Sequence, residues 1–402
     1  MKGVSMGSLR HVKVTIVAVL CVAAFAFFGL CGCGGNGGSG DPLGSSGGGE
    51  RLSVTAPVHK DSSFGGVYID VTIDEFNKLG FEYGDCVDIS FSNGYELKGI
   101  PYYNGYYVNV GDPLLVGYPG YPHVEAAVNY GSPLWDTAGL TDADSATITL
   151  VQAGAYRDVQ EAFNISYGID RDAYEGTDLQ WANFRALSGG DMKPGIAYRS
   201  ASPIDNEYNR VAYVDKAMRD AGVAFVLNLS DNKSEAHSFV KESKAQGLDM
   251  KYIGDLHSAG AIAYLDLSAS YPTQSFAQKL VGGLELMIGS DGPYLIHCIE
   301  GKDRTGFVCA LLEALCGASY DEMAADYMET FANYYGITLE SDPAKYNAIL
   351  HLNLDGMLRF LAGADDDVDL RTLDYQQAAR DYLRWGGMSD EDIDLLVEQL
   401  TQ

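Results

Sequence analysis

The chain of 402 residues contains few cysteines for its length. Three of the seven, Cys21, Cys31 and Cys33, lie in the first 33 residues, which leaves four for the rest of the chain. Four cysteines do not make a disulfide framework, and no Cys-x-x-Cys pair or Cys/His cluster with zinc spacing occurs. The sequence therefore argues against a small disulfide-stapled protein, and we expect neither a metal nor another cofactor.

Basic residues are also scarce. The chain has 27 Lys and Arg against 55 Asp and Glu, which gives a formal net charge of −28. Such a surface repels the phosphate backbone of nucleic acids, so we expect no nucleic-acid partner. A local basic pocket is still compatible with this charge, because net charge does not decide the field inside a cleft.

The one long stretch without charge lies near the start of the chain. Lys2, Arg10 and Lys13 precede an uncharged apolar run at residues 14–30. A basic region followed by an apolar region and small residues is typical of a secretory signal. The run is just shorter than the ~20 residues of a membrane-spanning helix, so a single retained anchor is the alternative.

The end of this leader resembles a bacterial lipobox. Leu30-Cys31-Gly32-Cys33 implies cleavage before Cys33 and attachment of lipid to its thiol, which makes residues 1–33 a signal peptide. Residues 34–50 are mostly Gly and Ser and predict a flexible linker. We therefore expect an exported protein held at the cell surface by an N-terminal membrane anchor, with a secreted or singly anchored protein as alternatives.

Residues 51–152 predict a small all-β domain. Segments at 66–73, 86–91 and 146–151 alternate between apolar and polar side chains or are rich in β-branched residues. Asn93-Gly94 and Asn104-Gly105 predict hairpin turns between strands. The many tyrosines of this domain either pack across the strands of a barrel or sandwich, or form a binding surface.

A few segments of this domain resemble the C-terminal β-domain of the S-adenosylmethionine hydroxide adenosyltransferases. The segments are Gly84-Asp85, Ile100-Pro101-Tyr102, Gly111-Asp112-Pro113-Leu114 and residues 124–132. The catalytic half of that family is absent from this chain. The resemblance therefore implies a fold and not a reaction.

Residues 153–402 predict an α/β domain with a mainly parallel sheet flanked by helices. The apolar run 223–229 is typical of a strand buried on both faces, and we expect further strands at 250–253 and 294–296 with helices between them. In such sheets ligands bind at the carboxyl ends of the strands. Three polar segments follow the expected strands: Ser230-Asp231, Asp255 and His297-Cys298.

The last of these segments carries the strongest functional pattern. Cys298 precedes Arg304 by six residues, Gly301 lies between them, and a helix is expected to start near Arg304. A short loop that closes onto a helix N-terminus points backbone N–H groups inward and binds an anion the size of phosphate. Arg304 can bind two phosphate oxygens at once, and the positive loop lowers the pKa of Cys298, so the thiolate becomes a nucleophile.

Two other interpretations of this loop fail. A small buried cysteine at a strand end explains Cys298 but not the arginine, the two glycines and the threonine at fixed offsets from it. A nucleotide-binding P-loop requires Gly-Lys-Ser/Thr, whereas Lys302 is followed here by Asp303. The pattern as a whole indicates phosphoryl chemistry.

The loop resembles that of the cysteine-dependent protein tyrosine phosphatases, in the bacterial and fungal branch with Lys-Asp inside the loop. The similar stretch is His297-Cys298-x-x-Gly-Lys-Asp-Arg-Thr-Gly306. Residues 183–187 and 193–201 resemble the upstream signature of that family. Together with a similar helical tail, the resemblance covers residues 153–402 and implies the cysteine-phosphatase fold.

The resemblance implies hydrolysis of phosphotyrosine through a phosphocysteine intermediate. Cys298 would attack phosphorus, and the loop would hold the transferring phosphoryl group. The implied phosphate-binding residues are Ile299, Glu300, Gly301, Lys302, Asp303, Arg304 and Thr305. The substrate is a phosphorylated protein or, as the alternative, a phosphoinositide; a third possibility is a catalytically silent lipoprotein that binds phosphoryl groups.

The general acid is the least determined part of this interpretation. A phenolate leaves better when it is protonated, so a carboxylic acid is expected near the loop. We favour Asp303, then Asp255, then Asp231, and place Asp266 in a mobile lid or insertion at residues 259–271. His297 is expected to orient or tune the loop. The sequence leaves the oligomeric state open.

Overall fold

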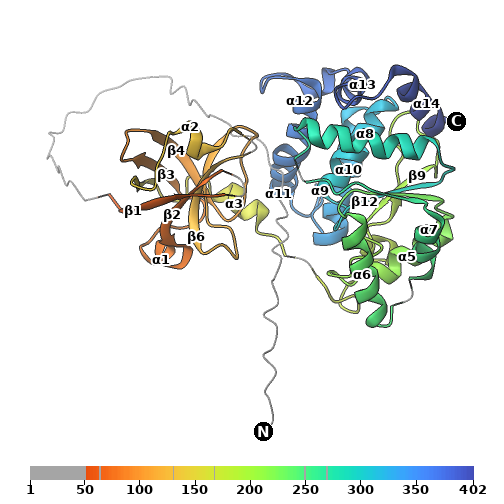
Figure 1. Cartoon of the computed structure of the whole chain (residues 1–402), viewed down its shortest axis with the longest axis horizontal. Helices are drawn as coiled ribbons and strands as arrows, with labels where there is room; N and C mark the ends of the chain where they lie inside the picture. Colours follow the sequence, from red (N-terminus) through yellow and green to blue (C-terminus); the bar gives the residue numbers. More distant parts are fainter. Residues whose placement is uncertain (1–50, 63–64, 130, 167, 249, 269) are drawn as a thin grey trace, which may run out of the picture.

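The computed structural model describes residues 51–402 except 63–64, 130, 167, 249 and 269. The leader, the linker and Cys33 lie outside the described residues. No helix of the described part is long and apolar enough to cross a membrane. The described chain forms a β-barrel followed by an α/β unit, drawn in orange to yellow and in green to blue in Figure 1.

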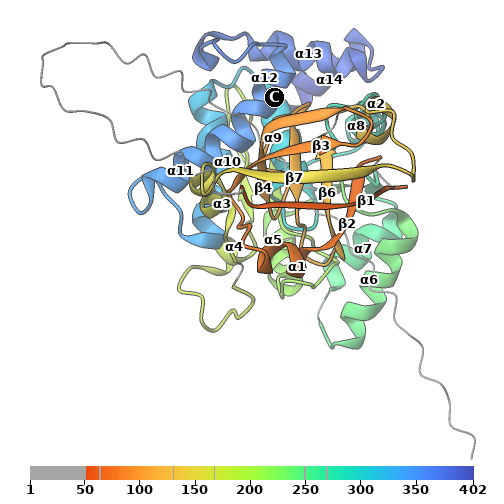
Figure 2. The same ribbon diagram turned by 90° about the vertical axis from the view of Figure 1, so that its left-hand side faces the viewer.

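The first unit is a closed barrel. In the described part of the chain its strands follow the order β1-β2-β6-β5-β4-β3-β7 around the wall. The strands are β1 Ser53–Lys60, β2 Val67–Thr72, β3 Cys86–Phe91, β4 Glu96–Tyr103, β5 Pro113–Val116, β6 His123–Val128 and β7 Ser145–Gln152, with short helices α1 Ile73–Lys78 and α2 Leu134–Thr137. Alternate apolar side chains such as Val58, Ile69, Ile89 and Ile148 fill the interior. The barrel wall faces the reader in Figure 2.

One of the two expected hairpins is present. Asn93-Gly94 joins β3 to β4, which pair antiparallel, and Gly94 has φ +93° as such a turn requires. The prediction for Asn104-Gly105 is wrong, because β4 and β5 pair in parallel, with Tyr102 opposite Leu115. A parallel pair needs a crossover, so residues 104–112 form a longer connection, and its Val108 packs with Tyr103 and Leu114 in a cluster separate from the barrel core.

The second unit is an α/β fold around a five-stranded sheet in the described residues, of order β11-β10-β12-β9-β8. The strands are β8 Arg185–Ala186, β9 Ala197–Ser200, β10 Phe225–Asn228, β11 Ile262–Tyr264 and β12 Tyr294–His297. The helices are α4 Asp178–Trp181, α5 Val211–Ala221, α6 Lys233–Ala245, α7 Lys251–Ala259, α8 Gln274–Ile288, α9 Asp303–Leu315, α10 Tyr320–Tyr335, α11 Pro343–Ile349, η1 Leu350–Asp355, α12 Gly356–Ala362, η2 Leu370–Thr372, α13 Tyr375–Trp385 and α14 Asp390–Thr401. The sheet is mixed rather than uniformly parallel, because β8 pairs antiparallel with β9.

Two expectations for this unit are wrong. Residues 250–253, expected as a strand, form the start of α7. The backbone N–H of Ile253 donates to the side-chain carboxylate of Asp215 at 2.8 Å instead of to a neighbouring strand. The strand lies instead at Ile262–Tyr264, inside the segment that we interpreted as a mobile lid. This short strand pairs in parallel with β10 and carries the next loop of the sheet.

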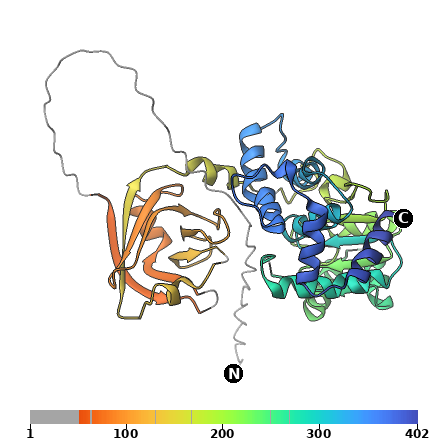
Figure 3. The same cartoon turned by 90° about the horizontal axis from the view of Figure 1, so that it is seen from above.

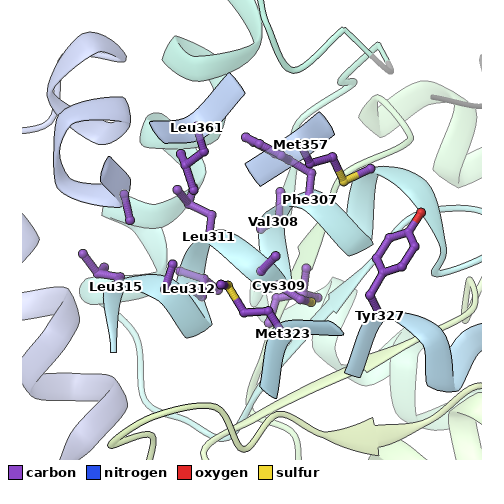
Figure 4. Close-up of a cluster of buried hydrophobic side chains, with 14 of the residues drawn as sticks. Phe307, Val308, Cys309, Leu311, Leu312, Leu315, Met323, Tyr327, Met357 and Leu361 are labelled. Atoms are coloured by element: carbon purple, nitrogen blue, oxygen red, sulfur yellow. The ribbon is translucent and has the colours of Figure 1, made fainter. Parts of the chain in front are cut away.

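Helix α9 is the centre of the α/β core. From Thr305 to Leu315 its side chains are buried all round, which is typical of a helix enclosed by other elements. Figure 4 shows how Phe307, Leu311 and Met357 pack against one another in this core. The N-terminus of this buried helix is therefore fixed in position, and it is the end onto which the cysteine loop closes.

Helix α3 (Arg157–Phe163) connects the two units (Figure 3). On the barrel side the carboxamide of Gln160 donates to Asn104 at 2.8 Å, and the ring of Phe163 stacks on Tyr107 with centroids 4.7 Å apart. On the other side α3 packs against α11. The barrel is thus docked on the α/β unit through apolar and polar contacts.

A buried ion cluster holds the sheet against α10. Asp326 of α10 accepts from Arg185 Nε at 2.7 Å and also pairs with Arg199, whose side chain is 1% exposed. Burial opposes the charge of Asp326, but the two guanidinium groups outweigh it and lower its pKa. Arg199 also donates to the carbonyl oxygen of Gly301 at 2.9 Å, so the cluster reaches the cysteine loop.

Replacing Asp326 tests this cluster. Asp326→Asn keeps the shape but leaves the guanidinium groups of Arg185 and Arg199 buried without their carboxylate. We expect the free energy of unfolding, measured by urea denaturation, to fall by roughly 3–5 kcal/mol. The control is Asp381→Asn, which removes a carboxylate from the exposed pair with Arg384 and should cost at most about 1 kcal/mol. Equal losses in the two variants would contradict the assignment.

Candidate active site

The cysteine loop runs from the end of β12 to the start of α9, and neighbouring groups turn its carbonyl oxygens outward. The N–H of Ser202 donates to Ile299 O at 2.9 Å. The hydroxyl of Tyr334 donates to Glu300 O at 2.6 Å. Arg199 and the carboxamide of Asn183 both donate to Gly301 O, at 2.9 and 3.2 Å.

These contacts fix the direction of the N–H groups. In a trans peptide the C=O and the following N–H point in opposite directions. The N–H groups of Glu300, Gly301 and Lys302 therefore point to the inner side of the loop, where α9 begins without a capping side chain in the described structure. Such a set of amides at a helix N-terminus binds an anion.

Gly301 is required by this loop for two reasons. Its φ is +69°, which is the left-handed region that favours glycine. A Cβ on Gly301 would also lie 2.1 Å from the carbonyl oxygen of Ser200. The backbone of the loop therefore passes directly against the end of β9.

Cys298 lies at the base of this loop with 3% of its surface exposed. Burial raises the pKa of its thiol, but the charge of Arg304 and hydrogen bonds from the hydroxyl and N–H of Thr305 lower it more, so the pKa is below its ordinary value. The guanidinium of Arg304 is held by a hydrogen bond from Nη1 to Leu267 O at 3.0 Å. Cys298, Arg304 and Thr305 are therefore brought together as the sequence pattern requires.

His297 is buried beside the loop. Burial is the main cause that lowers its pKa to about 4, and the charge of Arg304 acts in the same direction. The ring is therefore neutral near pH 7, and its Nδ1 lies 3.0 Å from Cys298 O. A neutral imidazole at this position orients the start of the loop rather than adding a charge to it.

Lys302 is a buried partner of its acidic neighbours. Its Nζ lies 2.9 Å from Glu300 Oε2 and 3.9 Å from Asp303 Oδ2. Burial opposes its charge, but the carboxylates of Asp303 and Glu300 outweigh burial and raise its pKa. Lys302, which the resemblance placed among the phosphate-binding residues, is thus paired with acidic side chains of its own loop.

Two of the candidate acids lie at the loop. Asp303 is 5% exposed, and its Oδ1 has no hydrogen-bond partner in the described part of the chain. Burial raises the pKa of Asp303 to about 6, although Lys302 acts against this rise. Asp231 follows β10 and accepts from the carboxamide of Asn228 at 2.9 Å. Burial raises the pKa of Asp231 more than this hydrogen bond and the charge of Arg304 lower it.

The placement of the other two acids corrects the sequence analysis. Asp255 does not follow a strand, because residues 251–259 are helical, and its side chain is exposed on α7. Asp266 follows β11 at the same edge of the sheet as the loop. Its N–H donates to Asp231 O at 3.3 Å, and its φ is +47°. The short apolar run at residues 261–265 is the sequence feature from which this strand could have been predicted.

Several residues of the site come from distant parts of the sequence, and no motif marks them as neighbours of the loop. Tyr334 belongs to α10, and Arg210 lies over its ring, with the guanidinium carbon 3.9 Å from the ring centroid. Tyr118 belongs to the barrel, and the charges of Glu300, Lys302 and Asp303 act on its hydroxyl. In the described residues, no group of three or more His, Cys, Asp or Glu side chains is placed to hold a metal ion.

Parts of the chain are similar to known proteins. The chain is 38% identical over 60 residues to the triple specificity protein phosphatase PtpB of Mycobacterium tuberculosis, which covers 15% of this chain and 22% of that protein. The core catalytic domain of the PP-IP phosphatase SIW14 from S. cerevisiae, solved with citrate, aligns with a TM-score of 0.24 and 20% identity, covering 42% of this chain and 96% of that one. An uncharacterized conserved protein from Thermotoga maritima aligns with a TM-score of 0.22 and 25% identity, over 25% and 37% of the two chains.

A family model described as the tyrosine phosphatase family matches residues 180–402, which is more than half of the chain and contains the whole cysteine loop. The chain belongs to the tyrosine phosphatase family.

Proposed function

We propose that the protein hydrolyses phosphotyrosine through a phosphocysteine intermediate. The observation that carries the proposal is the loop itself: Cys298 with a lowered pKa lies under inward-pointing amides, and Arg304 stands beside it. The sulfur anion and the anion site are then directed at the same phosphoryl group. Electrostatic stabilisation by amides and guanidinium lowers the barrier to transfer.

The reaction has two steps. In the first, Cys298 Sγ forms a bond to phosphorus while the bond from phosphorus to the tyrosine oxygen breaks, and the leaving oxygen takes a proton from the general acid. In the second, water attacks phosphorus, gives its proton to the same carboxylate, and the bond between sulfur and phosphorus breaks. Inorganic phosphate leaves, and the acid and the thiolate are restored.

Lys302 supports phosphotyrosine as the substrate over a phosphoinositide. A lysine beside the loop arginine would serve a second phosphate, but Lys302 is buried and paired with Glu300. The aromatic side chains of Tyr118 and Tyr334 beside the loop suit an aryl leaving group. The name of the mycobacterial relative supports a broader specificity, so phosphoserine peptides and phosphoinositides are the comparison substrates.

Removing the thiol tests the nucleophile. Cys298→Ser should lower kcat on p-nitrophenyl phosphate and on phosphotyrosine peptides by at least about a thousandfold, because a serine hydroxyl is not ionised at working pH. Binding of a phosphotyrosine peptide, measured by calorimetry, should persist because the amides and Arg304 remain. The matched control is Cys86→Ala in the barrel, which should keep kcat. Full activity of Cys298→Ser would overturn the mechanism.

The pH dependence of kcat/KM tests the general acid. Asp303 must be protonated to act, and its pKa is raised to about 6, so kcat/KM should fall as pH rises through about 6. On the acidic side it should fall only below the lowered pKa of Cys298, where the thiolate is lost. Asp303→Asn should remove the alkaline fall and lower kcat on phosphotyrosine by roughly 10²–10⁴-fold.

The controls are Asp231→Asn and Asp266→Asn, which should keep the alkaline fall. If Asp303→Asn keeps it and one of these variants loses it, that other residue is the acid. A p-nitrophenyl ester, whose leaving group departs without a proton, should be much less sensitive to the loss of the acid than phosphotyrosine.

A further inference from the structure

The barrel contributes a tyrosine-rich face beside the cysteine loop. Tyr118 lies in the connection between β5 and β6, and its hydroxyl is close enough to Glu300, Lys302 and Asp303 for their charges to alter its pKa, which burial raises. The barrel lies beside the α/β unit, next to α11 (Figure 1). The wall of the barrel is therefore part of the surroundings of the active site.

Glu125 is the unusual residue of this face. Its neighbours Val124 and Ala126 point into the barrel core, so the alternation of β6 directs Glu125 to the outside of the wall. An outward carboxyl group is normally solvated, yet Glu125 is 1% exposed. Its Oε1 has no hydrogen-bond partner among the described residues. This oxygen packs so closely against Gly66 that a Cβ on that residue would lie only 1.8 Å from it.

Three tyrosines, Tyr68, Tyr106 and Tyr121, are close enough to Glu125 for its charge to act on their hydroxyls. Tyr68 is the direct partner of Glu125 across β2 and β6. All three tyrosines are partly exposed, so aromatic surface that meets solvent lies near the carboxyl group.

These rings continue to the active site. The ring centroids of Tyr68 and Tyr121 are 6.4 Å apart, and those of Tyr121 and Tyr118 are 5.2 Å apart. Tyr118 in turn is the residue beside Glu300 and Asp303. A row of aromatic side chains thus leads from the cysteine loop to the buried carboxyl group.

The chemistry of this patch selects a cation. Aromatic ring faces attract ammonium and guanidinium groups, and the buried Oε1 of Glu125, which has no hydrogen-bond partner among the described residues, can accept from such a group. Burial, followed by the nearby carboxylate of Asp61, raises the pKa of Glu125 to about 8, so the group is mostly protonated near pH 7 and a cation placed beside it would favour its charged form. The net charge of −28 adds a general attraction for basic segments.

We propose that Tyr68, Tyr106, Tyr121 and Glu125 form a subsite that binds a Lys or Arg side chain of a phosphopeptide whose phosphotyrosine occupies the cysteine loop. An extended peptide advances ~3.3 Å per residue, so the basic residue lies a few positions from the phosphotyrosine. This inference rests on the proposed function and makes it narrower, since a phosphoinositide carries no cation for the subsite.

The experiment compares peptides on the full-length protein. Phosphotyrosine peptides that differ only by Lys, Arg or norleucine at each of the four positions on either side are assayed for kcat/KM. We expect a Lys or Arg peptide to exceed its norleucine counterpart by about tenfold at one or two positions. Glu125→Gln and Tyr121→Leu should each reduce this ratio to about two or less, whereas Asp142→Asn, at an exposed carboxylate elsewhere on the barrel, should keep it.

The outcomes separate this inference from the proposed function. If the wild-type protein hydrolyses p-nitrophenyl phosphate and Cys298→Ser does not, the result supports the phosphatase assignment but does not bear on the subsite. If that activity is present but basic and norleucine peptides differ by less than twofold everywhere, the subsite is refuted. A basic preference that survives in both Glu125→Gln and Tyr121→Leu, with thermal unfolding showing folded variants, also refutes it.

Discussion

The outward orientation of three consecutive carbonyl groups determines the chemistry of this protein. Because the oxygens of Ile299, Glu300 and Gly301 are held by donors outside the loop, the amides that follow them face inward. The anion site depends on that orientation, while Arg304, held by Leu267 O, and Thr305 lower the pKa of Cys298 beside it. The buried pair of Arg199 and Asp326 matters mainly because it keeps one of those donors in place.

The parts of the site that follow from local sequence were predictable. The apolar residues of β12, Gly301 and the start of α9 lie within a single stretch, so spacing alone indicates a strand, a loop and a buried helix. The cysteine and the arginine are on that same stretch, which is why their proximity could be inferred. The hairpin at Asn93-Gly94 is another local pattern, and it is present.

What depends on distant contacts could not be predicted in this way. Tyr334 and Asp326 come from α10, and nothing in their own sequence marks them as neighbours of the loop. Residues 250–253 have the composition of a strand, but the contact of Ile253 with Asp215 favours a helix, so Asp255 was misplaced. Asn104-Gly105 has the residues of a hairpin, but the parallel pairing of β4 and β5 is decided by the closed barrel.

The tie between the loop and α10 has a consequence for the order in which the chain matures. Cys298 leaves the ribosome before Asp326 and Tyr334. Until those residues pack, the carbonyl group of Glu300 lacks its Tyr334 donor, and Arg199, the donor to Gly301, lacks its carboxylate partner. The inward-facing set of amides is therefore complete only when the whole α/β unit has folded.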